Sequence, residues 1–232
     1  MNEYSPLYTC YTYNYSQQIY LADELVAGGG LGGPITALRF RYDSGGDPST
    51  TWDDWTVYMG GTEQSQFSGT TDWVPYTSLA QVFTGTVQPV AGEWMEITLD
   101  TPFEWDGAQN VVVAVDENAP DYSCTAEWSS YDAGSPRAML YYSDPVNPDP
   151  ASPPEADFGP GNTLAQVQFV GTQVPCDAIP DPGATTGPSN VCPNMPFDLT
   201  VENVAMQGGI SYQWETSPDG STWANASGNS NE

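Results

Sequence analysis

Four aspartates lie close together in the segment DSGGDPSTTWDD and could hold a calcium ion. They are Asp43, Asp47, Asp53 and Asp54. Ca²⁺ takes about six to eight oxygen ligands from carboxylates and carbonyls, and a loop that contains glycine can turn its carbonyls inward. Because thirty residues of this chain are acidic, four acids in a solvated loop also arise from composition. We therefore treat calcium as a hypothesis, and it is the only cofactor that the sequence suggests.

Tryptophans offer a second kind of site, because their flat apolar faces can stack on sugar rings. Trp52 adjoins the acidic loop and is the best candidate for glycan binding. Trp73, Trp105 and Trp128 are further candidates, although packing in a core or under long loops is the simpler account of them. The sequence thus predicts Trp52 as a binding residue on the surface.

Catalysis by two carboxylates, as in glycosidases, needs a pair of acids that flank a cleft with their pKa values pushed apart. Spacing along the chain does not show such a pair. With thirty acidic residues, some pairs of acids will have a spacing like that of catalytic pairs by chance. No catalytic residue is therefore assigned.

The composition excludes several other chemistries. The chain has three arginines but no histidine and no lysine, which rules out histidine relays, imidazole metal ligands and lysine Schiff bases. A formal net charge of -27 repels phosphate backbones and anionic lipids, so nucleic acid and direct membrane insertion are not expected. Cations, neutral glycans and other protein modules remain as partners.

The acidity could also indicate disorder, but the aromatic content argues against it. Eight Trp, fourteen Tyr and seven Phe supply the large apolar side chains that acidic disordered segments lack. The negative charge is then best explained as a solvated outer surface that tolerates high ionic strength. A saline or extracellular habitat follows from this interpretation.

Short alternating stretches separated by Gly, Pro, Asn and Asp predict an all-β sandwich. In ITALRFRY, Leu38, Phe40 and Tyr42 share one strand face, whereas Arg39 and Arg41 lie on the other. The arginines are therefore expected to pair with surrounding carboxylates on the surface.

The other strands follow from similar patterns. WTVYM places Trp55 on a buried face, and the Gly60-Gly61 pair is expected to end that strand. VVVAV, residues 111–115, is expected to be buried on both faces. Further strands are predicted in EWMEITL and at residues 8–13, 18–20, 79–83, 122–128, 138–142 and 164–170. The breaker-rich segment 143–162 is predicted to be a long loop.

A resemblance to a known class of protein rests on SQQIYLADEL, ITALRFRY, TWDDWTVYMGGTEQSQF, DWVPYTSLAQVFTGTV and EWMEITLDTPFEWDGAQNVVVAV. These segments, within roughly residues 16–118, resemble a β-sandwich module of large secreted and surface proteins of the phylum Bacteroidota. The resemblance implies a jelly-roll-like sandwich that often accompanies cargo of the type IX secretion route. It implies no catalytic activity for the module itself.

After Gly171 the chain is punctuated by proline and then carries VCPNMPFDLTV and ISYQWETSPDGSTW. These segments resemble the immunoglobulin-like or PKD-like repeats of the same proteins. We expect a jelly-roll-like domain at residues 1–173 and a partial immunoglobulin-like domain at residues 174–232. An immunoglobulin-like sandwich takes about 100 residues, so this domain is too short. Either the chain continues beyond Glu232, or a neighbouring chain supplies the missing strands.

The four cysteines allow three pairings. We expect Cys176 to pair with Cys192 around a Pro- and Gly-rich segment, and Cys10 to pair with Cys124. An even number of cysteines is typical of secreted proteins.

These features predict a non-enzymatic structural or adhesion module of a large extracellular or cell-surface protein. Its expected partners are neighbouring modules or like subunits that contact the incomplete second domain. The alternatives are a carbohydrate-binding accessory module of an exported hydrolase, with extracellular glycans as ligands, and a subunit of an extracellular filament.

Overall fold

The computed structural model describes residues 2–3, 6–44, 52–119, 126–171, 183–192, 197, 199–201 and 214–226. The chain divides into two compact units, Met1–Thr172 and Gln173–Glu232. This division lies one residue before the boundary expected from the sequence.

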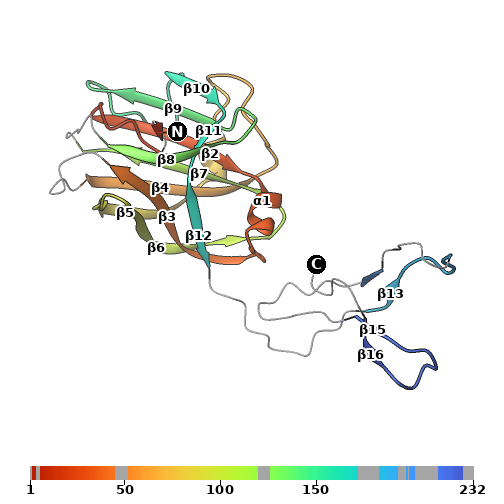
Figure 1. Ribbon diagram of the computed structural model, residues 1–232. Coiled ribbons are helices and arrows are strands. Elements are labelled where there is room, and N and C mark those ends of the chain that lie inside the picture. Colours follow the sequence, from red (N-terminus) through yellow and green to blue (C-terminus); the bar gives the residue numbers. More distant parts are fainter. Residues whose placement is uncertain are drawn as a thin grey trace. The chain divides into compact units, whose positions relative to one another are not determined.

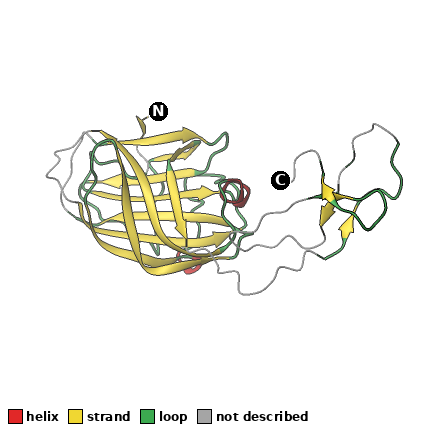
Figure 2. Cartoon of the chain, turned by 60° about the horizontal axis from the view of Figure 1, so that its bottom comes forward, coloured by secondary structure: helices red, strands yellow, loops and turns green. Residues whose placement is uncertain are grey.

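The first unit is an antiparallel β-sandwich of two six-stranded sheets (Figure 1). One sheet contains β1 (Asn2–Glu3), β3 (Gly33–Ser44), β6 (Glu93–Trp105), β8 (Glu127–Asp132), β11 (Thr163–Ala165) and β12 (Val167–Gly171). The other has the order β10 (Phe158–Gly161), β9 (Ala138–Ser143), β2 (Tyr13–Tyr20), β7 (Asn110–Glu117), β4 (Trp52–Thr62) and β5 (Ala80–Val87). The only helical elements among the described residues are α1 (Ala22–Ala27) and the 3₁₀ turn η1 (Tyr76–Ser78) (Figure 2). The predicted all-β sandwich is confirmed.

The main core lies between the two sheets and is built from alternating side chains. In β3, Leu38, Phe40 and Tyr42 are buried in this core, as their parity predicts. In β7, Val111, Val113 and Val115 enter the same core. Val112 and Ala114 point to the other face of the sheet and are also fully buried. The prediction that residues 111–115 are buried on both faces is therefore confirmed.

Two long loops cover the outer face of the sheet that contains β7. Phe67 and Val74 from residues 63–79 and Ala156 from residues 144–157 pack on that face. The loops also bind each other, because the Ala156 N–H donates to the Thr70 carbonyl at 2.8 Å and the Trp73 indole donates to the Pro154 carbonyl at 2.8 Å. Within the predicted loop 143–162, residues 158–161 form β10 and pair with β9.

Strand β4 continues past the point where the sequence predicts its end. Gly60 and Gly61 lie within β4 and pair with Val112 and Val111 of β7. A side chain at position 60 would place its Cβ 2.3 Å from the Ser78 carbonyl oxygen. The glycine there is needed for the close approach of the η1 segment, and it does not terminate the strand.

The second unit contains two short antiparallel ladders in its described residues. β13 (Thr185–Thr186) pairs with β14 (Thr200–Val201), and β15 (Glu215–Thr216) pairs with β16 (Ala224–Asn225). The predicted turn at Asp219-Gly220 is present, because the Asp219 carboxylate accepts the Ser221 and Thr222 N–H groups. In the described part of the chain, no helix is both long and apolar enough to span a bilayer.

Candidate functional site

The acidic loop is described only at its two ends, since Asp47 lies outside the described residues. Asp43 accepts a hydrogen bond from the Ser129 hydroxyl at 2.5 Å and lies 3.8 Å from Arg41 Nε. Asp53 accepts the Thr86 hydroxyl at 2.7 Å. Within the described ranges, no group of three or more acids or cysteines is placed to hold a metal ion. Calcium binding by Asp43, Asp47, Asp53 and Asp54 therefore stays a prediction.

Trp52 is a core residue, so the expectation that it lies exposed on the surface is wrong. Its side chain is only 4% exposed, and its ring stacks on Trp55 at 6.0 Å with the planes 10° apart. Regular alternation would place Trp52 and Trp55 on opposite faces of β4. The β4–β5 register instead shifts between these two residues, and Asp54 has a φ of 62°. This β-bulge turns Trp52 into the core, where its ring faces are not available to a glycan.

The other three candidate tryptophans, Trp73, Trp105 and Trp128, also serve packing. Trp105 and Trp128 are buried in the main core. Trp73 is partly buried under the loop 144–157 and donates to the Pro154 carbonyl. The simpler account of these residues, packing in a core or under loops, agrees with their positions.

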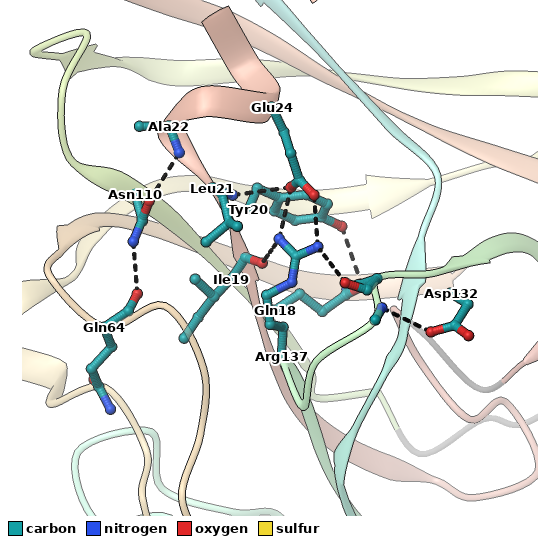
Figure 3. Close-up of polar contacts among 12 residues, drawn as sticks. Gln18, Ile19, Tyr20, Leu21, Ala22, Glu24, Gln64, Asn110, Asp132 and Arg137 are labelled. Carbon is teal, nitrogen blue, oxygen red and sulfur yellow. Dashed lines mark hydrogen bonds and ion pairs between the residues drawn. The ribbon is translucent and has the colours of Figure 1, made fainter. Parts of the chain in front are cut away.

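A buried arginine organises a cluster of polar contacts at the end of β2 (Figure 3). Arg137, just before β9, is 1% exposed, and its two terminal nitrogens donate to the two carboxylate oxygens of Glu24 in α1, each at 2.7 Å. The guanidinium also donates to the carbonyls of Ile19 and Ala133. The Arg137 hydrogen bond is the main reason that the pKa of Glu24 is lowered. This cluster fixes α1 to the end of β2.

Sequence reasoning missed this role of Arg137, because it treated the arginines as surface partners of carboxylates. Arg39 does behave in that way and forms an exposed pair with Glu96 at 2.6 Å. One signal was available: Arg137 directly precedes the apolar strand start AML, where a lone charge must be paired if it is buried.

Further buried polar groups in β2 hold neighbouring segments in place. The Gln18 Oε1 accepts the Ala165 N–H at 2.7 Å and the Tyr20 hydroxyl at 3.2 Å, and that hydroxyl also lies 3.1 Å from the Ala165 carbonyl. Asn110 joins two other segments, since it accepts the Ala22 N–H and donates to the Gln64 carbonyl (Figure 3). These contacts connect β2, α1 and β11 across the sandwich.

The Gln17 side chain binds the covering loop 63–79 through hydrogen bonds to the backbone of Val74. Its Oε1 accepts the Val74 N–H at 2.8 Å, and its Nε2 donates to the Val74 carbonyl at 3.0 Å and to the Tyr15 hydroxyl at 2.9 Å. All three groups are buried. The side chain thus pairs with both the N–H and the C=O of a buried loop residue.

We expect Gln17→Leu to destabilise the first unit by about 1–3 kcal/mol, because it leaves the buried Val74 N–H and C=O without partners. Urea unfolding followed by tryptophan fluorescence measures this loss. Gln81→Leu on the exposed side of β5 is the matched control and should change stability by no more than about 0.5 kcal/mol. Equal effects of the two substitutions would contradict the assigned role of Gln17.

Asp116 and Glu117 are buried carboxyls at the end of β7. Burial raises the pKa of Asp116 to about 7, although a hydrogen bond from Asn118 opposes the rise. Burial likewise raises the pKa of Glu117 to about 8, although a hydrogen bond from the Ala119 N–H opposes the rise. The two carboxyls therefore titrate where ordinary acids are already ionised.

One of the two predicted disulfides is absent at Cys192, a residue that the structure describes. Cys192 is a free, exposed thiol, so the expected Cys176–Cys192 disulfide is wrong. Among the residues within the described ranges, Cys10 is disulfide-bonded. Cys124 and Cys176 both lie outside those ranges, so the pairing of Cys10 with Cys124 stays a prediction.

Comparisons of this chain with protein-family models, with curated protein sequences and with solved structures find no match. The resemblance to modules of Bacteroidota surface proteins accordingly stays a prediction from the sequence.

Proposed function

We propose that this chain is a non-enzymatic structural or adhesion module of a secreted or cell-surface protein. The observation that carries the proposal is that the side chains best suited to chemistry in the first unit are used to hold the fold together. Arg137 fixes α1 through Glu24, Gln17 fixes the covering loop, and Trp52 packs in the core. A sandwich secured in this way is suited to spacing and display.

The surface charge supports an extracellular setting. A formal net charge of -27 keeps such a module soluble and separate from other acidic surfaces. Salt at extracellular or marine strength shortens the range of the self-repulsion, since the Debye length is about 8 Å at 0.15 M and about 3 Å at 1 M. The proposal therefore joins a rigid scaffold with a surface that is compatible with saline surroundings.

The proposal is tested by incubating the whole chain with a panel of chromogenic glycoside, ester and peptide substrates and by applying it to a glycan array. We expect no turnover of any substrate. Turnover that is abolished by a single Asp→Asn or Glu→Gln substitution would overturn the non-enzymatic assignment. Glycan binding without turnover would favour an adhesion role over a pure spacer.

A specific observation favours assembly as a second function. The described part of the second unit exposes large apolar side chains, with Phe197 51% and Trp223 59% exposed, and Val191 and Leu199 are also exposed. Exposed large apolar side chains are a feature of protein contact surfaces. Neighbouring modules or like subunits of a filament are the proposed partners of this unit.

We expect a chain that ends at Thr172 to be a cooperatively folding monomer. The full chain should either associate or be cleaved by protease within residues 173–232, because its exposed apolar side chains and short strand ladders are not covered. Light scattering and limited proteolysis of both forms distinguish these results. A monomeric full chain with a protease-resistant second unit would show that this unit is complete by itself and would remove the case for assembly.

A further inference from the structure

Two neighbouring carboxyls at the end of β7 are almost fully buried on opposite faces of one sheet. Asp116 is 3% exposed and Glu117 is 4% exposed. Asp116 Oδ2 accepts the Asn118 side-chain amide at 3.1 Å, and Glu117 Oε1 accepts the Ala119 N–H at 2.9 Å. The second oxygen of Asp116, Oδ1, is buried without a hydrogen-bond partner among the described residues. A charge on either group would therefore be poorly solvated.

No side-chain cation compensates these carboxyls. The three arginines are the only Lys, Arg or His residues of the chain, and each forms an ion pair elsewhere: Arg39 with Glu96, Arg41 with Asp43, and Arg137 with Glu24. A buried carboxylate that lacks a cation is strongly unfavourable. The charge inventory of the whole chain thus favours the neutral form of both groups.

The groups that face the two carboxyls are acids and phenols. The negative charges of Asp54 in β4 and Asp149 in the loop 144–157 raise the pKa of Asp116 further. The charge of Asp54 also raises the pKa of Glu117. The phenols of Tyr15 in β2 and Tyr58 in β4 lie within electrostatic range of Asp116. Each carboxylate that ionises next to the others adds repulsion to the cost of burial.

Asn118 connects this pair to two other segments. Its backbone N–H and its side-chain amide donate to the Asp54 carbonyl of β4 at 3.3 and 3.2 Å. Its Oδ1 accepts the side-chain amide of Asn147 in the covering loop at 2.8 Å. Asn118 thus joins β7 to β4 and to the loop 144–157. Its side-chain amide also donates to Asp116, so its position depends on that carboxyl.

We propose that Asp116 and Glu117 form a proton-operated latch, which keeps the end of β7 joined to β4 and to the loop 144–157 when both are protonated and loosens this junction when they ionise. The sign follows from linkage. Both groups have raised pKa values in the folded state, so the folded chain binds more protons than the unfolded chain above the ordinary carboxyl range. The stability of the first unit therefore falls as the pH rises from the ordinary carboxyl range to about 7 to 8, above which both groups are ionised in the folded and the unfolded chain.

The composition of the chain leaves few other groups that titrate near pH 7 to 8, which favours a test of the latch by its pH dependence. Histidine is the side chain that ordinarily titrates between about pH 5 and 8, and the chain has none. Ordinary carboxyls are ionised by about pH 6, so the general repulsion among them is nearly constant above that value.

The first experiment compares melting temperatures at pH 5.5 and pH 8.5 at constant ionic strength. The otherwise unchanged chain should melt on the order of 5–10 °C lower at pH 8.5. Asp116→Asn and Glu117→Gln should each reduce this difference, and the double variant should nearly abolish it. Glu104→Gln, at an exposed position of β6, is the matched control and should keep the full difference. An undiminished difference in the double variant would overturn the proposal.

Two measurements do not depend on whether the variants fold. The carboxyl ¹³C shifts of Asp116 and Glu117 in the unsubstituted chain should titrate above pH 6, and titration of both below pH 5 would overturn the proposal. Amide hydrogen exchange, corrected for its intrinsic pH dependence, should show the protection of the Asn118 amide falling at least about tenfold between pH 5.5 and 8.5. Unchanged protection of that amide would show that ionisation does not open the junction.

Discussion

Trp128→Ala is expected to lower the free energy of unfolding of the first unit by about 3–5 kcal/mol, because it removes a large side chain from a closed core. Trp128 is fully buried. Its ring packs on Tyr42 at 5.2 Å and on Trp52 at 5.6 Å between ring centroids. It therefore connects β8 to β3 and β4, and the rigid strands cannot collapse into the space that the substitution leaves.

Urea unfolding monitored by circular dichroism at two wavelengths measures this loss. Trp223→Ala in the second unit is the same chemical change at an exposed position and should alter stability by no more than about 0.5 kcal/mol. Trp128→Phe should be tolerated better than Trp128→Ala, because it keeps a ring and removes an indole N–H that is buried without a hydrogen-bond partner in the described structure. A Trp128→Ala variant as stable as the Trp223→Ala variant would contradict the central position of this ring.

Glu24→Ala is expected to cost about 3–5 kcal/mol, because it leaves the buried Arg137 guanidinium without a counter-charge. The effect should be asymmetric, since the Arg137 side chain is 1% exposed and that of Glu24 is 40% exposed. In Arg137→Met, the remaining Glu24 carboxylate can turn to water, so we expect a smaller cost of about 1–3 kcal/mol. The double variant should be more stable than Glu24→Ala.

The surface pair between Arg39 and Glu96 supplies the control for this experiment. Its contact is as short, at 2.6 Å, but its side chains are 41% and 45% exposed. Glu96→Ala should therefore cost no more than about 1 kcal/mol. If Glu24→Ala and Glu96→Ala had equal effects on the unfolding free energy, burial of Arg137 would not be what makes the inner pair important.

The inner pair also has a defined pH dependence. Arg137 lowers the pKa of Glu24 in the folded state, so the stability from this pair is present above the ordinary glutamate range and is lost as the pH falls through the lowered pKa. The latch at Asp116 and Glu117 has the opposite sign. We expect the first unit to be most stable at mildly acidic pH, between these two transitions.

Much of the sandwich could be predicted from local patterns. Alternation in residues 35–42 placed Leu38 and Phe40 in the core, and the unbroken apolar run 111–115 indicated a strand with two covered faces. These inferences succeed because side chains alternate strictly along a regular strand. The absence of histidine and lysine likewise limited the possible chemistry from composition.

The sequence-based predictions were wrong where they assumed regular alternation along a strand or exposure at the surface, and there the tertiary structure was needed. A bulge with a left-handed Asp54 turned Trp52 inward, and approach of the η1 segment explained Gly60. Burial of Arg137, Asp116 and Glu117 depends on segments far apart in the chain that cover them. The sequence by itself determined which residue types could be charged and which strands could form, because these are local properties. Which charges lose water and which rings are exposed was decided only when distant segments packed together, because solvation depends on every neighbour in space.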